Sequence, residues 1–79
     1  MKTIYKKRYR QIILSLVAKR KQSALTQQQL ADKLEKPQSY IAKIEKYERK
    51  LDVMEFIEFC EALDIDTADM VDILRRSKC

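Results

Sequence analysis

The sequence contains no glycine and no histidine, and it has one proline, Pro37, and two cysteines, Cys60 and Cys79. Without histidine, a glycine-rich phosphate loop, a cysteine pair at metal-ligand spacing or a serine with a base nearby, the chain lacks the usual means of catalysis. We therefore expect no enzyme activity, no metal, no cofactor and no small-molecule substrate. Two cysteines with one at the last residue indicate no disulfide framework, and Cys60 is expected to be a small buried side chain on an apolar helical face.

Long apolar runs are also absent. No stretch approaches the roughly 18 consecutive apolar residues that indicate a transmembrane helix. The basic start leads into an amphipathic segment and not into the apolar core of a signal peptide. We expect a cytoplasmic protein with no membrane partner, and the length of 79 residues predicts one domain, residues 1–79.

Negative charge is scarce in the first part of the chain. Residues 1–50 carry 14 Lys and Arg against 4 Asp and Glu, whereas residues 51–79 carry 3 against 8. The overall charge of +5 therefore combines a basic half with an acidic half. This division is typical of a protein that presents one side to a polyanion, so it favours nucleic-acid binding.

The clearest local pattern lies between residues 26 and 46. Thr26 and Gln29 have the spacing of a capping box, and apolar residues then recur on one helical face. Pro37 disfavours helical angles at the residue before it but suits the first turn of a helix. The pattern predicts two short helices joined by a tight turn, at about 27–35 and 37–46.

The second of these helices has two chemically different sides. Ile41 and Ile44, three residues apart, are expected to point inward. The outward side carries amide and hydroxyl groups and cations, on Gln38, Ser39, Ala42, Lys43 and Lys46. Such groups suit the base edges and phosphates of DNA, so this helix is predicted to lie against DNA.

The stretch resembles the helix-turn-helix of the Cro/cI (Xre) family of bacterial and phage DNA-binding proteins, and the resemblance extends over about residues 13–74. The matching residues are Gln27, Leu30, Ala31, Leu34, Ser39, Ile41, Ile44, Glu45 and the run Glu48, Arg49, Lys50, Leu51 and Asp52. The resemblance implies an all-α, compact five-helix lambda-repressor-like DNA-binding domain, here with an extended first helix.

Two positions depart from the family's pattern. The family normally has glycine in the turn between the two helices, where this chain has Glu35, and often after the recognition helix, where it has Tyr47. Two alternatives follow. Either non-glycine residues hold left-handed backbone angles, at a cost of roughly 1 kcal/mol per site, or the turns are remodelled.

Periodicity predicts three further helices. The first runs over residues 3–22 with Thr3 as a cap, the fourth over about 53–63 with Asp52 and Glu55 as its capping box, and the fifth over about 67–76 with Asp66 as its cap. Val53 and Ile57 are expected to widen the apolar stripe of the fourth helix. The cations near the start of the first helix either approach the phosphate backbone or are solvated: Lys6, Lys7, Arg8 and Arg10.

The residues expected to contact DNA fall into two groups. Base readout is expected from Pro37, Gln38, Ser39 and Lys43, and Gln38 is the best reader because its amide can bond bidentately to adenine. Phosphate contacts are expected from Gln27, Lys36, Tyr40, Lys46, Arg49 and Lys50. For Tyr40, partial packing is an equal alternative. The resemblance also implies a partly buried ion pair between Arg20 and Glu45, which would tie the first helix to the recognition helix.

These features predict a transcriptional regulator that binds double-stranded DNA. The resemblance implies a repressor that reads a palindromic operator through the major groove as a homodimer. The alternative is the antitoxin half of a toxin–antitoxin pair, which binds its own promoter and also has a protein partner. In that case the acidic half or the chain ends would bind the partner.

Overall fold

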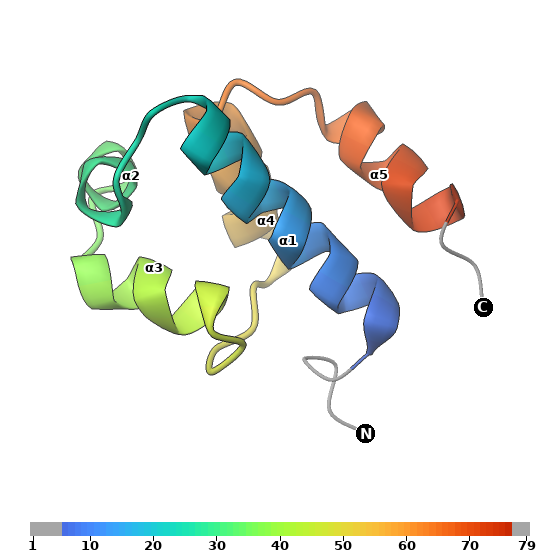
Figure 1. Ribbon diagram of the computed structural model, residues 1–79, viewed down its shortest axis with the longest axis horizontal. Coiled ribbons are helices and arrows are strands. Elements are labelled where there is room, and N and C mark those ends of the chain that lie inside the picture. The colour runs from blue at the N-terminus through green and yellow to red at the C-terminus, as the bar shows by residue number, and fades with distance from the viewer. Residues whose placement is uncertain (1–5, 77–79) are drawn as a thin grey trace.

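Five helices and no strands occur in the part of the chain that the computed structural model describes, residues 6–76 (Figure 1). They are α1 (Lys7–Gln22), α2 (Gln27–Leu34), α3 (Gln38–Glu45), α4 (Val53–Ala62) and α5 (Thr67–Arg76). The all-α, five-helix fold is therefore confirmed, and α1, with 16 residues, is longer than the other four helices.

The first helix begins later than predicted. Lys6 is extended, with φ −73° and ψ 136°, and α1 starts at Lys7. The prediction of a helix continuous from residue 3 is therefore wrong, and the predicted cap Thr3 lies outside the described residues. Lys6, Lys7 and Arg8 offer a physical reason, since cations near a helix N-terminus oppose the helix dipole.

The predicted capping residues define where α2 and α4 start. Thr26 accepts a hydrogen bond from the Gln29 backbone at 3.0 Å, and the Gln29 side chain accepts one from the Thr26 backbone at 2.9 Å. Asp52 and Glu55 form the same reciprocal pair at the start of α4. Helix α2 ends one residue earlier than predicted. Helix α3 is one residue shorter than predicted at each end, and Pro37 is its N-cap.

Each of the first four helices ends in the same glycine-type turn, although the chain has no glycine. The residues at the left-handed position are Ala24, Glu35, Tyr47 and Asp64, with φ between 56° and 63°. At each turn the next residue donates to the carbonyl five positions earlier, as Leu25 does to Arg20 and Lys36 to Ala31, which is the Schellman arrangement. The turns are therefore not remodelled: non-glycine residues hold the left-handed angles.

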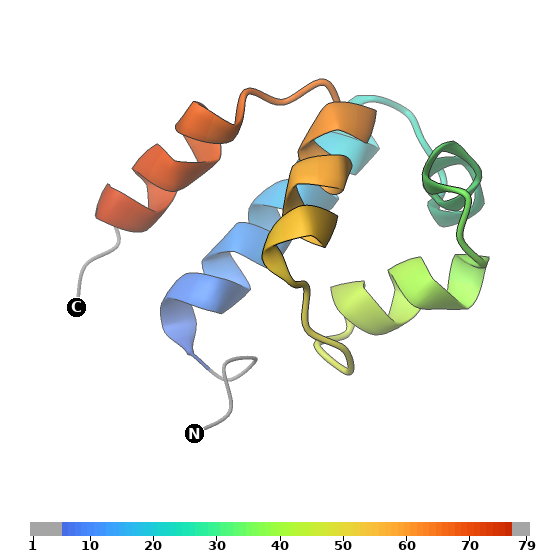
Figure 2. The same ribbon diagram turned by 180° about the vertical axis from the view of Figure 1, so that it is seen from behind.

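The helices pack around one apolar core. Its buried members come from all five helices and from the residue that ends α4, and are Ile12, Ile13, Leu16, Leu30, Ala31, Ile41, Ile44, Phe59, Cys60, Leu63 and Met70. In Figure 1, α1 crosses the middle of the molecule, with α5 on one side and α2 and α3 on the other, and α4 lies behind α1. In Figure 2, which is seen from the opposite side, α4 lies in front of α1. This arrangement leaves one side of α3 without a helix covering it.

One predicted core residue is exposed. Val53 is 74% exposed, so the expectation that it widens the core stripe of α4 is wrong. As the first residue of α4, it lies at the rim of an open groove between α1, α4 and α5 and not over the core. Ile57 is half-buried, and Cys60 is fully buried as expected.

Candidate nucleic-acid interface

The exposed side of α3 carries the residues predicted to read DNA. Ile41 and Ile44 are buried, which fixes the orientation of the helix on the core. The opposite side is open to solvent and presents Pro37, Gln38, Ser39, Lys43 and Lys46. Amides, hydroxyls and cations are thus accessible along the side of α3 that no other described helix covers.

The predicted ion pair between Arg20 and Glu45 is present. The Arg20 Nε donates to Glu45 Oε2 at 2.7 Å and Nη2 donates to Oε1 at 3.1 Å, so the pair is bidentate. The remaining Arg20 Nη1 donates to the Leu25 carbonyl at 2.7 Å. Because Arg20 is only 8% exposed, this contact fixes the last turn of α1 against the last turn of α3.

A hydrogen-bond chain continues from this ion pair to the exposed end of α3. The Gln27 Nε2 donates to Glu45 Oε1 at 2.9 Å, and Gln38 Nε2 donates to Gln27 Oε1 at 2.6 Å. Gln27 was predicted only as a phosphate contact, and sequence reasoning missed that its amide orients Gln38. The second hydrogen of Gln38 Nε2 and its Oε1 stay available, which is the pair of groups that a bidentate contact to adenine needs.

Tyr40 is packed against the body of the domain. Its ring centroid lies 6.2 Å from that of Phe59, and it hydrogen-bonds to Glu55. Burial and the nearby Glu55 carboxylate raise the pKa of Tyr40 to about 12. Of the two alternatives for Tyr40, phosphate contact and partial packing, the structure shows the packing contact.

Arg49 lies between Tyr40 and α4. Its guanidinium carbon is 4.7 Å from the Tyr40 ring centroid, and its Nη1 and Nη2 donate to Glu55 Oε1 and Oε2 at 3.1 and 2.9 Å. The Arg49 side chain is 42% exposed and that of Glu55 13% exposed. The hydrogen bond from Arg49 lowers the pKa of Glu55 to about 2, so the carboxylate stays charged at neutral pH. Sequence reasoning assigned Glu55 to capping and did not predict its ion pair with Arg49.

The start of α1 reaches the loop that follows α3. The Tyr9 hydroxyl accepts a hydrogen bond from the Leu51 backbone at 3.0 Å, and the guanidinium carbon of Arg10 lies 4.4 Å from the Tyr47 ring centroid. Burial raises the pKa of Tyr9. The sequence left the role of Arg10 open, and the structure places it beside the loop that carries Arg49 and Lys50. Lys36 Nζ lies 5.4 Å from the centroid of the Tyr40 ring, which Arg49 also contacts.

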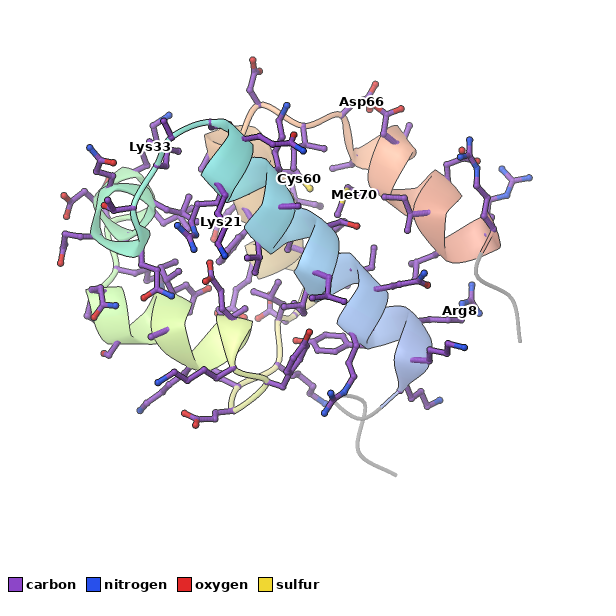
Figure 3. The ribbon with its side chains drawn as sticks, in the orientation of Figure 1. Arg8, Lys21, Lys33, Cys60, Asp66 and Met70 are labelled. Carbon is purple, nitrogen blue, oxygen red and sulfur yellow. The ribbon has the colours of Figure 1, made fainter. Side chains whose placement is uncertain are left out.

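Acidic side chains gather elsewhere. Glu58, Glu61, Asp64, Asp66 and Asp69 are exposed on α4, on α5 and on the turn between them. Asp66 lies at the start of α5, on the side of the molecule away from α3, and Arg8 points to the other end of α5 (Figure 3). Cations of the first half also lie among these acids, because Lys33 donates to the Ala62 carbonyl at 3.3 Å and Lys19 lines the same hollow as Asp66 and Asp69. The charge division of the sequence is therefore only partly a division in space.

Two other kinds of feature are absent from residues 6–76. No helix there is long and apolar enough to span a bilayer. Within the same range, no group of three or more His, Cys, Asp or Glu residues is placed to hold a metal ion.

Comparisons with known proteins agree with this geometry. The helix-turn-helix family model matches residues 16–70. Among solved structures, an XRE-family like protein from Pseudomonas syringae pv. tomato str. DC3000 is similar, with 35% identity, a TM-score of 0.85, and coverage of 91% of this chain and 88% of that chain. No curated protein matches the chain. With the family match spanning most of the chain and a closely superposable relative, the protein belongs to the XRE family of helix-turn-helix proteins and is a DNA-binding regulator of transcription.

Proposed function

We propose that this protein is a sequence-specific repressor that binds a palindromic operator as a homodimer, with α3 in the major groove. The observation that carries the proposal is the exposed polar side of α3, held in place by the chain of contacts from Arg20 through Glu45 and Gln27 to Gln38. A reader of bases must be held in a defined position, because base contacts discriminate only when their geometry is fixed.

The residues divide into readers and anchors. Pro37, Gln38, Ser39 and Lys43 lie at accessible positions on or before α3 and would contact base edges, with Pro37 against a thymine methyl. The anchors would hold phosphates: Gln27 with the N-terminus of α2, and the side chains of Lys36, Tyr40, Lys46, Arg49 and Lys50. For Tyr40 this contact requires its hydroxyl to leave Glu55, since its ring packs on Phe59.

The proposed dimer follows from size and geometry. The chain measures 35 × 26 × 20 Å and contains one recognition helix, so one copy covers about one half-site. Two copies related by a two-fold axis would place their recognition helices roughly 34 Å apart, in successive major grooves on one side of the duplex. A palindromic operator is the DNA counterpart of that symmetry.

The test of this function is the salt dependence of binding to duplex DNA. We expect binding to weaken steeply with salt, with a log–log slope of about −0.9 for each phosphate contacted. Lys46→Ala should make the slope shallower by about 0.9 per protomer, whereas Glu61→Gln, which changes charge on the acidic side, should leave it unchanged. Binding that is absent or insensitive to salt contradicts the proposed function.

A second candidate rests on the acidic side of the molecule. Exposed acids gather on α4, on α5 and on the turn between them, and Asp66 lies on the side of the molecule away from α3, so a basic protein could bind there while α3 contacts DNA. This arrangement fits an antitoxin that represses its own promoter. A cotranscribed neighbouring gene whose product arrests growth, and is neutralised by coexpression of this protein, would favour this role over that of a stand-alone repressor.

A further inference from the structure

Arg49 differs from the other cations of the proposed DNA-binding surface. Among residues 6–76, Lys36, Lys43, Lys46 and Lys50 have no ion pair, whereas Arg49 donates both terminal nitrogens to the Glu55 carboxylate at 3.1 and 2.9 Å. The charges of Arg49 and Glu55 therefore nearly cancel for a phosphate that is still distant. Arg49 lies on the binding surface, but its charge is compensated from within the same protein.

Capping of α4 does not explain why position 55 carries a charge. The capping box needs one side-chain acceptor for the Asp52 backbone N–H, and glutamine supplies one as well as glutamate. Glu55 does more than this: its two oxygens receive the Asp52 N–H, both Arg49 nitrogens and a hydrogen bond from Tyr40. The negative charge is thus directed at Arg49 and not at the helix terminus alone.

A carboxylate that holds a guanidinium through two parallel hydrogen bonds occupies it in the same way as a phosphate group does. Both anions present two oxygens to the same pair of N–H groups. A DNA phosphate that approaches Arg49 must therefore displace Glu55 or accept an arginine whose strongest contacts are already made. Tyr40 keeps the guanidinium at the surface during this exchange, because its ring lies 4.7 Å from the Arg49 guanidinium carbon.

We propose that Glu55 acts as an internal competitor of DNA phosphate for Arg49, and so limits the affinity of this protein for duplex DNA. The inference rests on the proposed DNA-binding function and adds a residue that sets the strength of that binding. Glu55 lowers the number of effective phosphate contacts on DNA of any sequence. Arg49 contributes fully only where the other contacts hold a phosphate close enough to displace the carboxylate.

The experiment is a double-mutant cycle between Glu55→Gln and Arg49→Ala, read by binding to a duplex of random sequence over a range of salt concentrations. Glu55→Gln keeps the capping hydrogen bond, and circular dichroism establishes that each variant is folded. In the presence of Arg49, we expect Glu55→Gln to raise affinity about tenfold and to steepen the salt slope by about 0.9 per protomer. In the Arg49→Ala background, we expect most of this gain to disappear.

The matched control is Glu48→Gln, which removes an exposed carboxylate from the same loop and has no contact with Arg49 among the described residues. Its effect on affinity should be the same with Arg49 or Ala at position 49. If Glu55→Gln behaves like this control, Glu55 only repels phosphate through space and the proposal is wrong. If Glu55→Gln weakens binding, then Glu55 helps Arg49 to contact DNA and does not compete with phosphate, so the proposal is wrong in that case too.

A second variant covers the case in which Glu55→Gln does not fold. Arg49→Lys keeps the positive charge but cannot form the two parallel bonds to Glu55, so we expect a steeper salt slope than that of the wild type. A shallower or equal slope contradicts the proposal. Wild-type binding in the same titration tests the proposed function separately. If the wild type binds duplex DNA but the double-mutant cycle shows no coupling between positions 49 and 55, only the proposed role of Glu55 is wrong.

Discussion

At the level of single residues, Glu45 connects the core to the proposed DNA-binding surface. It accepts hydrogen bonds from Arg20 on α1 and from Gln27 on α2, and it is itself the last residue of α3. Three helices thus meet at one carboxylate whose side chain is 11% exposed. A buried ion pair of this kind fixes geometry more reliably than it adds stability.

The first prediction concerns the removal of this carboxylate. Glu45→Ala leaves the charge of Arg20 buried without its partner, so we expect a loss of about 3–5 kcal/mol in the free energy of unfolding. DNA affinity should fall as well, because Gln27 and Gln38 lose the group that holds them. Urea denaturation and DNA titration measure the two effects. If Glu45→Ala leaves both quantities untouched, the ion pair has no structural role.

A paired replacement separates stability from recognition. Arg20→Leu combined with Glu45→Leu removes both charges, and apolar pairs of similar volume often restore stability at such sites. We expect the double variant to be more stable than Glu45→Ala. Its preference among DNA sequences should still be reduced, because both variants lack the Glu45 carboxylate to which Gln27 donates. Full recovery of sequence preference would show that the chain of contacts to Gln38 does not matter.

At the scale of helices and turns, the absence of glycine has a measurable consequence. Four helix ends place a non-glycine residue at φ between 56° and 63°, and each is expected to cost on the order of 1 kcal/mol relative to glycine. Glu35→Gly should therefore raise stability by about 0.5–1 kcal/mol, after allowance for the greater freedom of glycine in the unfolded chain. That gain corresponds to an increase of a few degrees in the melting temperature.

The control for this second prediction lies in the interior of α1. Ala18 is exposed and helical, so Ala18→Gly should lower stability by about 1 kcal/mol, the opposite sign at a position with ordinary helical angles. Thermal unfolding of both variants supplies the comparison. A destabilised Glu35→Gly would mean that the Glu35 side chain stabilises this turn by more than its backbone strain costs.

The third prediction uses the pKa of Glu55, which is lowered from 4.5 to about 2 by its hydrogen bond with Arg49. A carboxylate whose pKa is lower in the folded than in the unfolded protein stabilises the folded state at pH values above its unfolded pKa. This stabilisation is lost as the pH falls through the folded pKa. We expect the difference in unfolding free energy between wild type and Glu55→Gln to be constant at neutral pH and to shrink between about pH 4.5 and pH 2. If the difference in unfolding free energy stays the same over this pH range, the ion pair between Arg49 and Glu55 does not stabilise the fold.

The local features of the fold were predictable from the sequence, because they depend on neighbouring residues. Thr26 with Gln29, Asp52 with Glu55, and the inward pair Ile41 and Ile44 are all signals within one helix turn. The start of α1 and the exposure of Val53 were predicted wrongly. The first depends on the charges near the helix N-terminus and the second on where α4 begins relative to the core, and periodicity alone specifies neither.

The parts of the candidate site that were missed join residues far apart in the chain. Gln27 with Gln38, Arg49 with Glu55 and Arg10 with Tyr47 each connect two elements through side-chain length and direction. No spacing in the sequence encodes such a contact. The Arg20–Glu45 pair was found only because the family resemblance supplied it.

At the scale of the whole molecule, charge and shape lead to the fourth prediction. With one recognition helix in a body 35 Å long, specific binding to a palindrome should involve two protomers per duplex. Light scattering with size exclusion, on and off DNA, measures the stoichiometry. A monomer at micromolar concentrations, both free and on a DNA fragment that it selects, would count against the proposed dimer and the palindrome together.

In the proposed complex, the exposed side of α3 reads bases while cations around it hold phosphates. The decisive measurement is the selection of binding sites from random duplex DNA, with wild type, Gln38→Ala and Lys46→Ala in parallel. We predict that Gln38→Ala loses preference at one base position per half-site, at roughly 1–3 kcal/mol of discrimination, and that Lys46→Ala keeps the preferred sequence but weakens binding to all sequences alike. Identical behaviour of the two variants, or an unchanged preferred sequence for Gln38→Ala, would contradict it.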